Sequence, residues 1–293
     1  MPHLCTFCGE PDLSPSKVTR KNSWRGTRSY LYCSNCVGFT LSPPLNSVEM
    51  DALYSDYFNE SPEIEALHSL EEKFLDLERY MQTHGEIQDV LDYGCGVDGY
   101  LHSRSRSWEV NIDGFEVSTK TLNILRERYP NSQFFDPESF DATKKSYDLI
   151  VLSDVLEHLS NPKELLDSLK SRLKEDGRIW IQQPLENNTT LFTLLLKIRI
   201  FLTYSKFAEI PPFHVSFASR KSMQTLLQRC EFEIISYQVF ETMWPAKEGI
   251  DFLSPKNSIL TVIKFVDMLA SKFLTNYGTR VIFLVKKGNR ACS

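Results

Sequence analysis

The chain has 293 residues, 42% of them hydrophobic, and a formal net charge of −5. This length suits one large domain or two modest ones, and the hydrophobic content predicts a packed core rather than a disordered chain. The mild acidity provides no general field that would attract nucleic acid, so we expect no nucleic-acid partner.

The beginning of the chain, MPHLCTFCGE, lacks the charged start and apolar run of a signal peptide. We find no run of about 18 apolar residues, so we expect no transmembrane segment. Four of the seven cysteines lie in two C-x-x-C pairs, and the others are scattered, unlike a secreted disulfide framework. These features predict a cytoplasmic protein.

Residues 1–45 form a segment with too few aliphatic side chains to fold on a hydrophobic core alone. Its two pairs, Cys5 with Cys8 and Cys33 with Cys36, are separated by 24 residues, enough for a β-hairpin. Two such turns brought together give a tetrahedral four-cysteine site that suits structural zinc. Free or redox-active thiols are the alternative.

Residues 46–85 are expected to form a helical linker or cap. Within SLEEKFLDLERYM, apolar residues recur at helical spacing at Leu70, Phe74, Leu77 and Met81.

The pattern then changes to strands alternating with helices. We expect strands at DVLDYG, NIDGFEVS, SQFFD, YDLIVLSDVLEHL (which runs into a polar turn) and RIWIQQP, and helices at KTLNILRERY and NPKELLDSLKSRLKEDG. The second helix is predicted to begin at an Asn161 cap and to end at Gly177. This alternation predicts an α/β fold, with helices on both faces of a mostly parallel sheet.

The remaining chain completes a domain expected over 86–293, with helical insertions near 185–215 and 245–279. We expect helices at TTLFTLLLKIRIFLTY, SRKSMQTLLQRC and SPKNSILTVIKFVDMLASKFL, and strands at FEIISYQVF and RVIFLVKKG.

The stretch LDYGCGVDGY, residues 91–100, carries the main functional signal. Its glycines, Gly94, Gly96 and Gly99, fit the G-x-G-x-x-G turn of dinucleotide-binding proteins. Asp92 opposes that interpretation, because a carboxylate near the pyrophosphate would be unfavourable. S-adenosylmethionine fits better, since it carries an ammonium and a sulfonium and no phosphate. A nicotinamide-dependent oxidoreductase is the alternative.

Glu116 ends the second expected strand, twenty residues after Gly96. An acid at this place binds the ribose hydroxyls of either ligand, so it indicates a nucleoside without choosing between the two. A solvated carboxylate at a strand end is the plain alternative.

The chain resembles class I S-adenosylmethionine-dependent methyltransferases. The resemblance rests on VLDYGCG (90–96), GFEVS (114–118), YDLIVLSDVLEHLSNP (147–162) and LKEDGRIWIQQP (173–184). The EHL at 157–159 is similar to ubiquinone-pathway O-methyltransferases, and residues 1–45 resemble the zinc ribbon of a subgroup that includes sugar C-methyltransferases. The implied fold is a Rossmann-like, doubly wound sheet with a small zinc ribbon and helical cap insertions.

The resemblance also implies a cofactor pocket along the carboxyl ends of the first four strands. Its members by position are Asp92, Tyr93, Gly94, Cys95, Gly96, Glu116, Val117, Asp136, Ser153, Asp154 and Val155. The family's usual third glycine falls here on Asp98, with Gly99 one place later. This departure keeps open a methyltransferase fold that no longer catalyses.

His214 and His158 are the candidate catalytic bases, which a hydroxyl or acidic C–H acceptor would require. His214 is expected on a segment crossing the methyl end of the pocket, and its alternative role is to anchor that segment. His158 follows the fourth strand and has a structural or cofactor-side alternative. The sugar C-methyltransferases carry Tyr-x-Glu-His near this position, where this chain has PPFH, and so carbon methylation of a sugar is in doubt.

The predicted function is methyl transfer to a small molecule such as a sugar nucleotide, a polysaccharide precursor or a secondary-metabolite intermediate. Residues 191–202, LFTLLLKIRIFL, predict a buried helix or a peripheral membrane contact. An RNA-binding zinc ribbon is a further alternative, based on a basic and aromatic cluster at Arg20, Lys21, Trp24, Arg25, Arg28 and Tyr30. The sequence does not predict the oligomeric state.

Overall fold

The computed structural model describes residues 4–22, 26–46, 48–49, 67–203, 214–243 and 255–288. The chain divides into two compact units. The first unit comprises residues 1–45, 156–164 and 182–283, and the second comprises 46–155, 165–181 and 284–293. The division at 1–45, 46–85 and 86–293 expected from the sequence stays a prediction.

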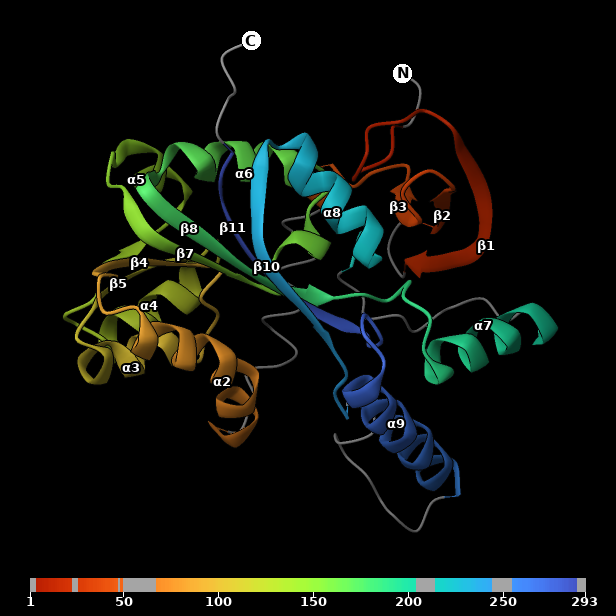
Figure 1. Ribbon diagram of the computed structural model, residues 1–293. Helices are drawn as coiled ribbons and strands as arrows, with labels where there is room; N and C mark the ends of the chain where they lie inside the picture. The colour runs from red at the N-terminus through yellow and green to blue at the C-terminus, as the bar shows by residue number, and fades with distance from the viewer. Residues whose placement is uncertain are drawn as a thin grey trace. The chain divides into compact units, whose positions relative to one another are not determined.

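A seven-stranded sheet has the strand order β10-β11-β8-β7-β4-β5-β6 (Figure 1). Its strands are β4 (Asp89–Tyr93), β5 (Asn111–Phe115), β6 (Phe134–Phe135), β7 (Tyr147–Ser153), β8 (Leu173–Pro184), β10 (Phe232–Phe240) and β11 (Arg280–Lys287). The pairs β4–β5, β4–β7 and β5–β6 are parallel, as the alternation of strands and helices predicts. All five strands expected between residues 88 and 184 are present.

The central strands of this sheet are buried. Leu149, Ile150, Val151 and Leu152 of β7 have no exposed surface, and Leu91 of β4 has none either. Consecutive apolar residues are needed here because a central parallel strand is covered on both faces.

The helices of the second unit are α2 (Leu67–Thr83), α3 (Tyr100–Trp108), α4 (Thr119–Arg128) and α5 (Pro137–Ala142), and α6 (Pro162–Ser171) begins in the first unit. Phe74, Leu77 and Met81 of α2 are buried, which confirms the helical spacing predicted for them. The side chain of Leu70 lies outside the described residues. The sequence analysis missed the short helices α3 and α5.

The helix predicted to end at Gly177 ends instead at Ser171, and β8 begins at Leu173. The prediction was wrong over residues 172–177 because tertiary contacts favour the strand. Leu173 is buried, and the ammonium of Lys174 lies 2.7 Å from Asp89 Oδ2 and 2.9 Å from Asp148 Oδ2. The Asn161 amide donates to Glu164, and no hydrogen bond from a helix N–H to Asn161 is found in the described part of the chain.

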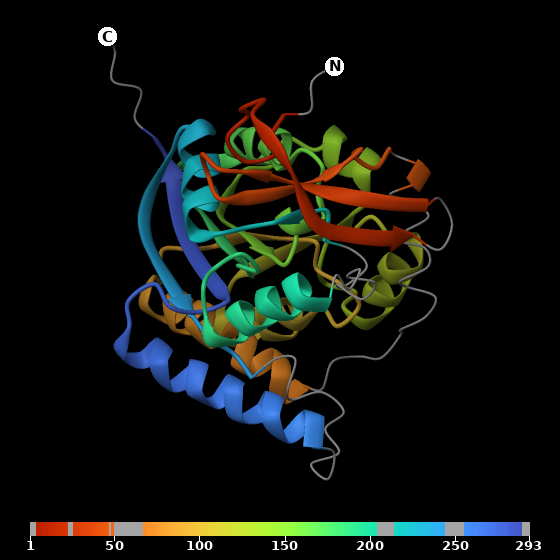
Figure 2. The ribbon, with the colours of Figure 1, turned by 90° about the vertical axis from the view of Figure 1, so that its right-hand side faces the viewer.

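The first unit contains a four-stranded antiparallel sheet, seen in red, orange and green in Figure 2. Its strands are β1 (Leu13–Asn22), β2 (Gly26–Cys33), β3 (Gly38–Ser42) and β9 (Ser216–Phe217). The β1–β2 hairpin is the one that the spacing of the cysteine pairs allows. The Tyr30 ring stacks on Phe217, with centroids 4.4 Å apart, so a distant segment closes this sheet.

Helices α7 (Leu191–Thr203), α8 (Arg220–Arg229) and α9 (Pro255–Phe273) complete the first unit. Ser219 caps α8 in a reciprocal capping box with Ser222, and its hydroxyl also donates to the carbonyl of Cys36. No helix in the described ranges is long and apolar enough to cross a membrane.

Candidate functional site

The predicted cofactor residues gather at one edge of the sheet. Asp92 and Tyr93 end β4, Glu116 follows β5, Asp136 follows β6, and Ser153 ends β7. Because these strands are parallel neighbours, their carboxyl ends meet. This edge is where open α/β sheets bind ligands.

Two glycines of the turn after β4 are required by their surroundings. Gly94 has a φ of +81°, and a Cβ there would lie 2.9 Å from the Val155 side chain. Gly99 has a φ of +57°, and a Cβ would lie 2.7 Å from the Tyr129 ring. Only glycine fits such positions without strain.

Asp98, which departs from the family's glycine pattern, acts at the start of α3. Its Oδ1 accepts a hydrogen bond from the backbone N–H of Tyr100 at 3.0 Å. Arg128 donates to the carbonyls of Val97 and Asp98, and the Tyr129 hydroxyl also donates to Asp98. The turn is therefore closed and braced from α4, although its third glycine is displaced by one position.

Asp92 is the most perturbed acid of this edge, with only 6% of its surface exposed. Burial raises the pKa of Asp92 to about 8, and the nearby carboxylates of Asp98 and Glu116 add to this rise. Lys73 lowers it by a smaller amount. Asp98 and Glu116 therefore raise the cost of ionising Asp92, a cost that a bound cation would lower and a bound phosphate would increase.

Glu116 is fixed to the glycine turn by backbone hydrogen bonds. One oxygen accepts from Gly96 N at 3.2 Å, and the other accepts from Val117 N at 2.8 Å and Ser118 N at 3.0 Å. Burial raises the pKa of Glu116, while these N–H groups oppose the rise. A carboxylate offers about four acceptor positions, so capacity remains for a ligand hydroxyl.

The end of β7 brings Ser153, Asp154 and Val155 together, as predicted. The Ser153 hydroxyl is buried without a hydrogen-bond partner among the described residues. Asp154 has a left-handed backbone, with φ +56°, and its carboxylate pairs with Lys73 of α2 at 3.0 Å. The Ser153 hydroxyl therefore has hydrogen-bonding capacity left, whereas Asp154 already has a cationic partner.

The other predicted cofactor residues lie in different environments. The Tyr93 ring stacks on Phe115 at 4.1 Å, Cys95 is buried, and Val117 is 47% exposed. Asp136 caps α5 by accepting from Ser139 N at 2.8 Å, a structural role that the sequence analysis missed.

His102 of α3 is a further residue of this edge that the sequence analysis missed. Its Nε2 lies 3.9 Å from Asp92 Oδ2, and the residue is only 3% exposed. Burial lowers the pKa of His102 to about 4, so the ring is neutral at pH 7 and does not neutralise Asp92. No motif includes this histidine, and only its place in space reveals it.

The four predicted metal ligands come together in the first unit. The Sγ atoms of Cys5 and Cys36 lie 3.5 Å apart, as do those of Cys8 and Cys33, and all four thiols lie within 4.8 Å of one another. These separations are too long for disulfides, whose sulfurs lie about 2.05 Å apart. They approach the edge of about 3.8 Å expected for four sulfurs around zinc at about 2.3 Å.

His214 lies between two carboxylates of the first unit. Its Nδ1 is hydrogen-bonded to Glu186 Oε1, and its Nε2 lies 3.9 Å from Glu157 Oε1. Its carbonyl accepts from the Tyr30 hydroxyl at 2.7 Å, and Val215 N donates to the carbonyl of Glu157 at 2.8 Å. The hydrogen bond at Nδ1 therefore orients the ring.

His158 belongs to the same cluster, with its ring 5.0 Å from that of His214 between centroids. Glu157, His158 and His214 each offer one ligand atom within 4.8 Å, a set able to hold a cation. The sequence analysis missed Glu157 and Glu186 as partners of His214. The sequence signal that could have identified Glu186 is its position two residues after the end of β8.

Comparison with known proteins identifies the family to which the sequence belongs. A family model described as a methyltransferase domain matches residues 64–237, more than half of the chain. The chain belongs to this methyltransferase-domain family. The family predicted by resemblance is confirmed, and this favours S-adenosylmethionine over a nicotinamide cofactor.

Two curated relatives match shorter stretches. A ubiquinone biosynthesis O-methyltransferase of Glaesserella parasuis is 29% identical over 104 residues, 31% of this chain and 43% of the relative. A malonyl-(acyl-carrier protein) O-methyltransferase of Halalkalibacterium halodurans is 30% identical over 109 residues, 34% of this chain and 40% of the relative. The chain spans 43% to 65% of the length of the first three curated relatives.

The solved structures agree with the predicted fold. A SAM-dependent methyltransferase from Archaeoglobus fulgidus has a TM-score of 0.52 and 18% identity, covering 80% of this chain and 99% of that one. The Rossmann-like fold is thereby confirmed.

The basic and aromatic cluster considered for RNA lies partly outside the described residues, at 23–25.

Replacing Asp92 by Asn is expected to stabilise the ligand-free protein at alkaline pH. The folded-state pKa of Asp92 is raised, so the stability it contributes is fully present below the ordinary pKa of 3.8 and is lost progressively as the pH rises from there to about 8. Asp92→Asn removes this loss, with an expected gain on the order of 2 kcal/mol at pH 8.5 and little at pH 5. Urea unfolding at both pH values measures it.

Asp89→Asn is the matched control, because Lys174 lowers the pKa of Asp89 and its carboxylate is stabilising when ionised. That variant should be less stable than wild type at both pH values. An Asp92→Asn protein no more stable than wild type at pH 8.5 would contradict the buried-acid account.

Proposed function

We propose that this protein transfers the methyl group of S-adenosylmethionine to a small-molecule acceptor. The observation that carries the proposal is the buried Asp92 at the glycine turn, beside the carboxylates of Asp98 and Glu116. A cationic ligand relieves the repulsion among these acids, whereas the pyrophosphate of a dinucleotide increases it.

In this proposal, each part of S-adenosylmethionine is assigned to residues of the second unit. Asp92 and the backbone of Gly94 and Gly96 would hold the methionine end, with the Ser153 hydroxyl within the same edge. Glu116 would accept from the ribose hydroxyls, and the exposed side chain of Val117 would contact the adenosine. Bound there, S-adenosylmethionine supplies an electrophilic methyl group on a sulfonium.

In this proposal His214 is the base that removes the acceptor proton. The proton would pass to Nε2, while Glu186 at Nδ1 fixes the ring and stabilises the imidazolium that forms. Glu157 and His158 follow Val155 by two and three residues in the chain, which supports a place for this cluster in the reaction. A hydroxyl acceptor is favoured, because the named relatives are O-methyltransferases.

The acceptor class proposed is a sugar nucleotide, a polysaccharide precursor or a secondary-metabolite intermediate bearing such a hydroxyl. The segment PPF at 211–213, which departs from the sugar C-methyltransferase pattern, lies outside the described residues. Methylation at carbon stays the second choice, because the sequence PPFH departs from the Tyr-x-Glu-His of the sugar C-methyltransferases.

We also propose structural zinc at Cys5, Cys8, Cys33 and Cys36. The hydrogen bond between Cys5 and Cys36 lowers the pKa of Cys5 to about 5, and the same bond together with burial raises the pKa of Cys36. Four adjacent thiolates repel one another, and a divalent cation removes that repulsion. Because all four positions belong to the protein, no open position remains for catalysis.

Methyl transfer is tested with S-adenosylmethionine labelled at the methyl group and fractions of a small-molecule extract. We expect label to enter a small molecule with wild type and to enter at least about 100-fold more slowly with His214→Gln, since a general base contributes about 10²–10⁴. Glu186→Gln should cost less, about 10-fold, and shift the pH profile.

The control for this experiment is the affinity for S-adenosylmethionine, which both variants should retain. No transfer by a wild type that binds S-adenosylmethionine would favour the inactive-fold alternative. Transfer by His214→Gln within a few-fold of wild type would exclude His214 as the base.

The zinc proposal predicts about one zinc per chain by elemental analysis. Cys36→Ser should lose the metal and melt at a lower temperature, because the first unit then loses the cross-link between its two turns. Cys292→Ser, which removes a thiol outside both pairs, is the matched control and should retain the metal. Full metal content in Cys36→Ser would contradict the site.

A further inference from the structure

Helix α9 of the first unit has an inverted distribution of polarity. Lys264 is 1% exposed and Asp267 is fully buried, whereas the apolar residues on the other side of the helix are exposed. A helix on a protein surface ordinarily does the reverse, with its charges in water and its apolar stripe inside.

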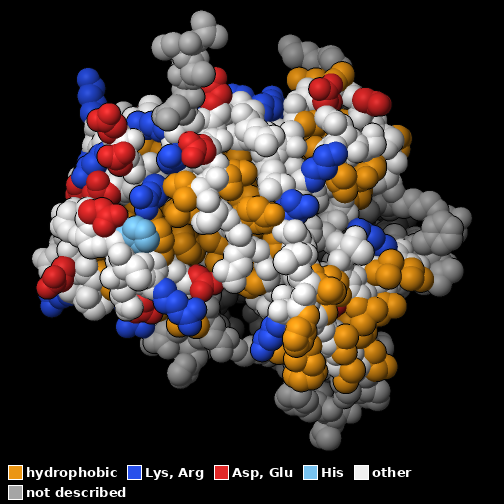
Figure 3. All heavy atoms as spheres, in the orientation of Figure 1, with side chains coloured by type: hydrophobic (Ala, Val, Ile, Leu, Met, Phe, Trp, Pro, Cys, Tyr) orange, Lys and Arg blue, Asp and Glu red, His pale blue; other side chains and the backbone are white. Residues whose placement is uncertain are grey.

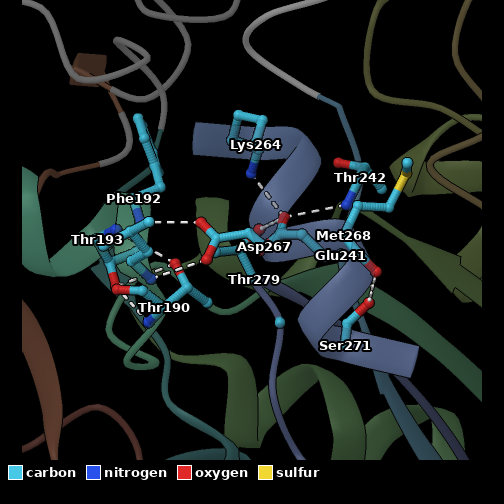
Figure 4. A network of polar contacts seen from close by, with 12 residues as sticks. Thr190, Phe192, Thr193, Glu241, Thr242, Lys264, Asp267, Met268, Ser271 and Thr279 are labelled. Atoms are coloured by element: carbon cyan, nitrogen blue, oxygen red, sulfur yellow. Dashed lines mark hydrogen bonds and ion pairs between the residues drawn. The ribbon is translucent and has the colours of Figure 1, made fainter. Parts of the chain in front are cut away.

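The inward face of α9 is held by a polar network, shown in Figure 4. Lys264 Nζ donates to Glu241 Oε1 at 2.6 Å, and the Thr279 hydroxyl donates to the same oxygen. The Lys264 ammonium also lies 5.0 Å from the centre of the Phe192 ring. A buried charge must be paired in this way, and the pairing fixes which side of the helix faces inward.

Asp267 joins α9 to the beginning of α7. Its two oxygens accept from Leu191 N at 2.8 Å and Phe192 N at 2.9 Å, and the Tyr277 hydroxyl donates to it as well. The carboxylate therefore caps the N-terminus of α7, where unpaired N–H groups and the helix dipole favour an anion. The network holds both helices with their apolar side chains outward.

The outward side chains form one apolar surface over two helices, visible at the lower right of Figure 3. On α9, Val262 is 62% exposed and Phe273 is 84% exposed, and on α7, Leu194 and Ile198 are each 45% exposed. We call this the α7–α9 surface. Its described members are Leu194, Leu195, Ile198, Ile259, Val262, Phe265, Val266, Leu269 and Phe273.

The charge of these helices is positive, although the whole chain carries −5. Helix α7 contains Lys197 and Arg199 and no acid, and α9 contains three lysines and one acid, Asp267. That acid is buried, whereas Lys197 and Lys272 are exposed. Apolar side chains combined with cations and no exposed acid match an anionic lipid surface.

We propose that the α7–α9 surface docks on the face of a bilayer that contains anionic lipid. The sequence of residues 191–202 predicts either a buried helix or a peripheral membrane contact, and the exposed apolar side chains of α7 and α9 favour the contact and extend it to a second helix. The apolar residues enter the boundary between headgroups and acyl chains, and Lys197 and Lys272 reach the headgroups. The helices lie on the membrane and do not cross it.

A second copy of the chain fits this surface less well. A two-fold contact would bring each cationic helix pair against another, with no exposed acid on either helix in the described ranges to neutralise them. The exposed residues also cover two helices rather than the single seam of a coiled coil.

The test is co-sedimentation of the full chain with vesicles of phosphatidylcholine, alone or with about one-third phosphatidylglycerol. We expect sedimentation with the anionic vesicles, several-fold weaker with the neutral ones and weakened by salt. Val262→Ser combined with Phe273→Ser should lower the partition coefficient by about 10-fold or more, because two apolar side chains leave the lipid. Lys197→Glu with Lys272→Glu should lower binding to anionic vesicles alone.

Ile235→Ser is the matched control, since it removes a 43% exposed apolar side chain of β10 that lies outside the α7–α9 surface. All variants should have the same melting temperature as wild type, because the changed side chains are exposed. The proposal is overturned by failure of wild type to sediment at low salt, by equal binding to neutral vesicles, or by unchanged binding of the Val262 and Phe273 variant. A dimer that this variant abolishes, without vesicle binding, would identify a second copy as the occupant.

Discussion

A carboxylate kept out of water needs a cation, and this constraint at Asp92 organises the candidate site. The parallel strands place Asp92 at the carboxyl edge of the sheet, where Asp98 and Glu116 add like charge. Lys73, which lowers the pKa of Asp92, is already paired with Asp154 at 3.0 Å. In the proposed function this acid pairs with a positively charged ligand, and in the ligand-free protein it lowers the stability when it is ionised.

In the first unit, charged side chains that are removed from water are paired, and the pairs have a structural role. Lys264 and Asp267 are buried, and each finds its partners within the unit, so the charges fix the orientation of α9. His214 is likewise positioned by carboxylates, with Glu186 on one ring nitrogen and Glu157 near the other. In each case a paired charge fixes the orientation of the element or ring that carries it.

The sequence predicted what depends on local pattern. Strand β4, the glycine turn and the cysteine pairs were found because short-range spacing specifies them. The helix assigned through Gly177 was wrong, because Lys174 is drawn to Asp89 and Asp148, which are 85 and 26 residues away in the chain. His102 and Glu186 were missed for the same reason, since their partners come from distant segments. The capping role of Asp136 needed the position of Ser139, which a strand-end motif does not include.

The central claim is tested most directly by calorimetric titration of the ligand-free protein with S-adenosylmethionine at pH 7, in buffers of different ionisation enthalpy. With its pKa raised to about 8, Asp92 is mostly protonated before binding, and a cationic ligand should expel close to one proton. Asp92→Asn should bind more weakly and release none. Binding of NAD in place of S-adenosylmethionine, or binding of S-adenosylmethionine with no proton released, would contradict the account.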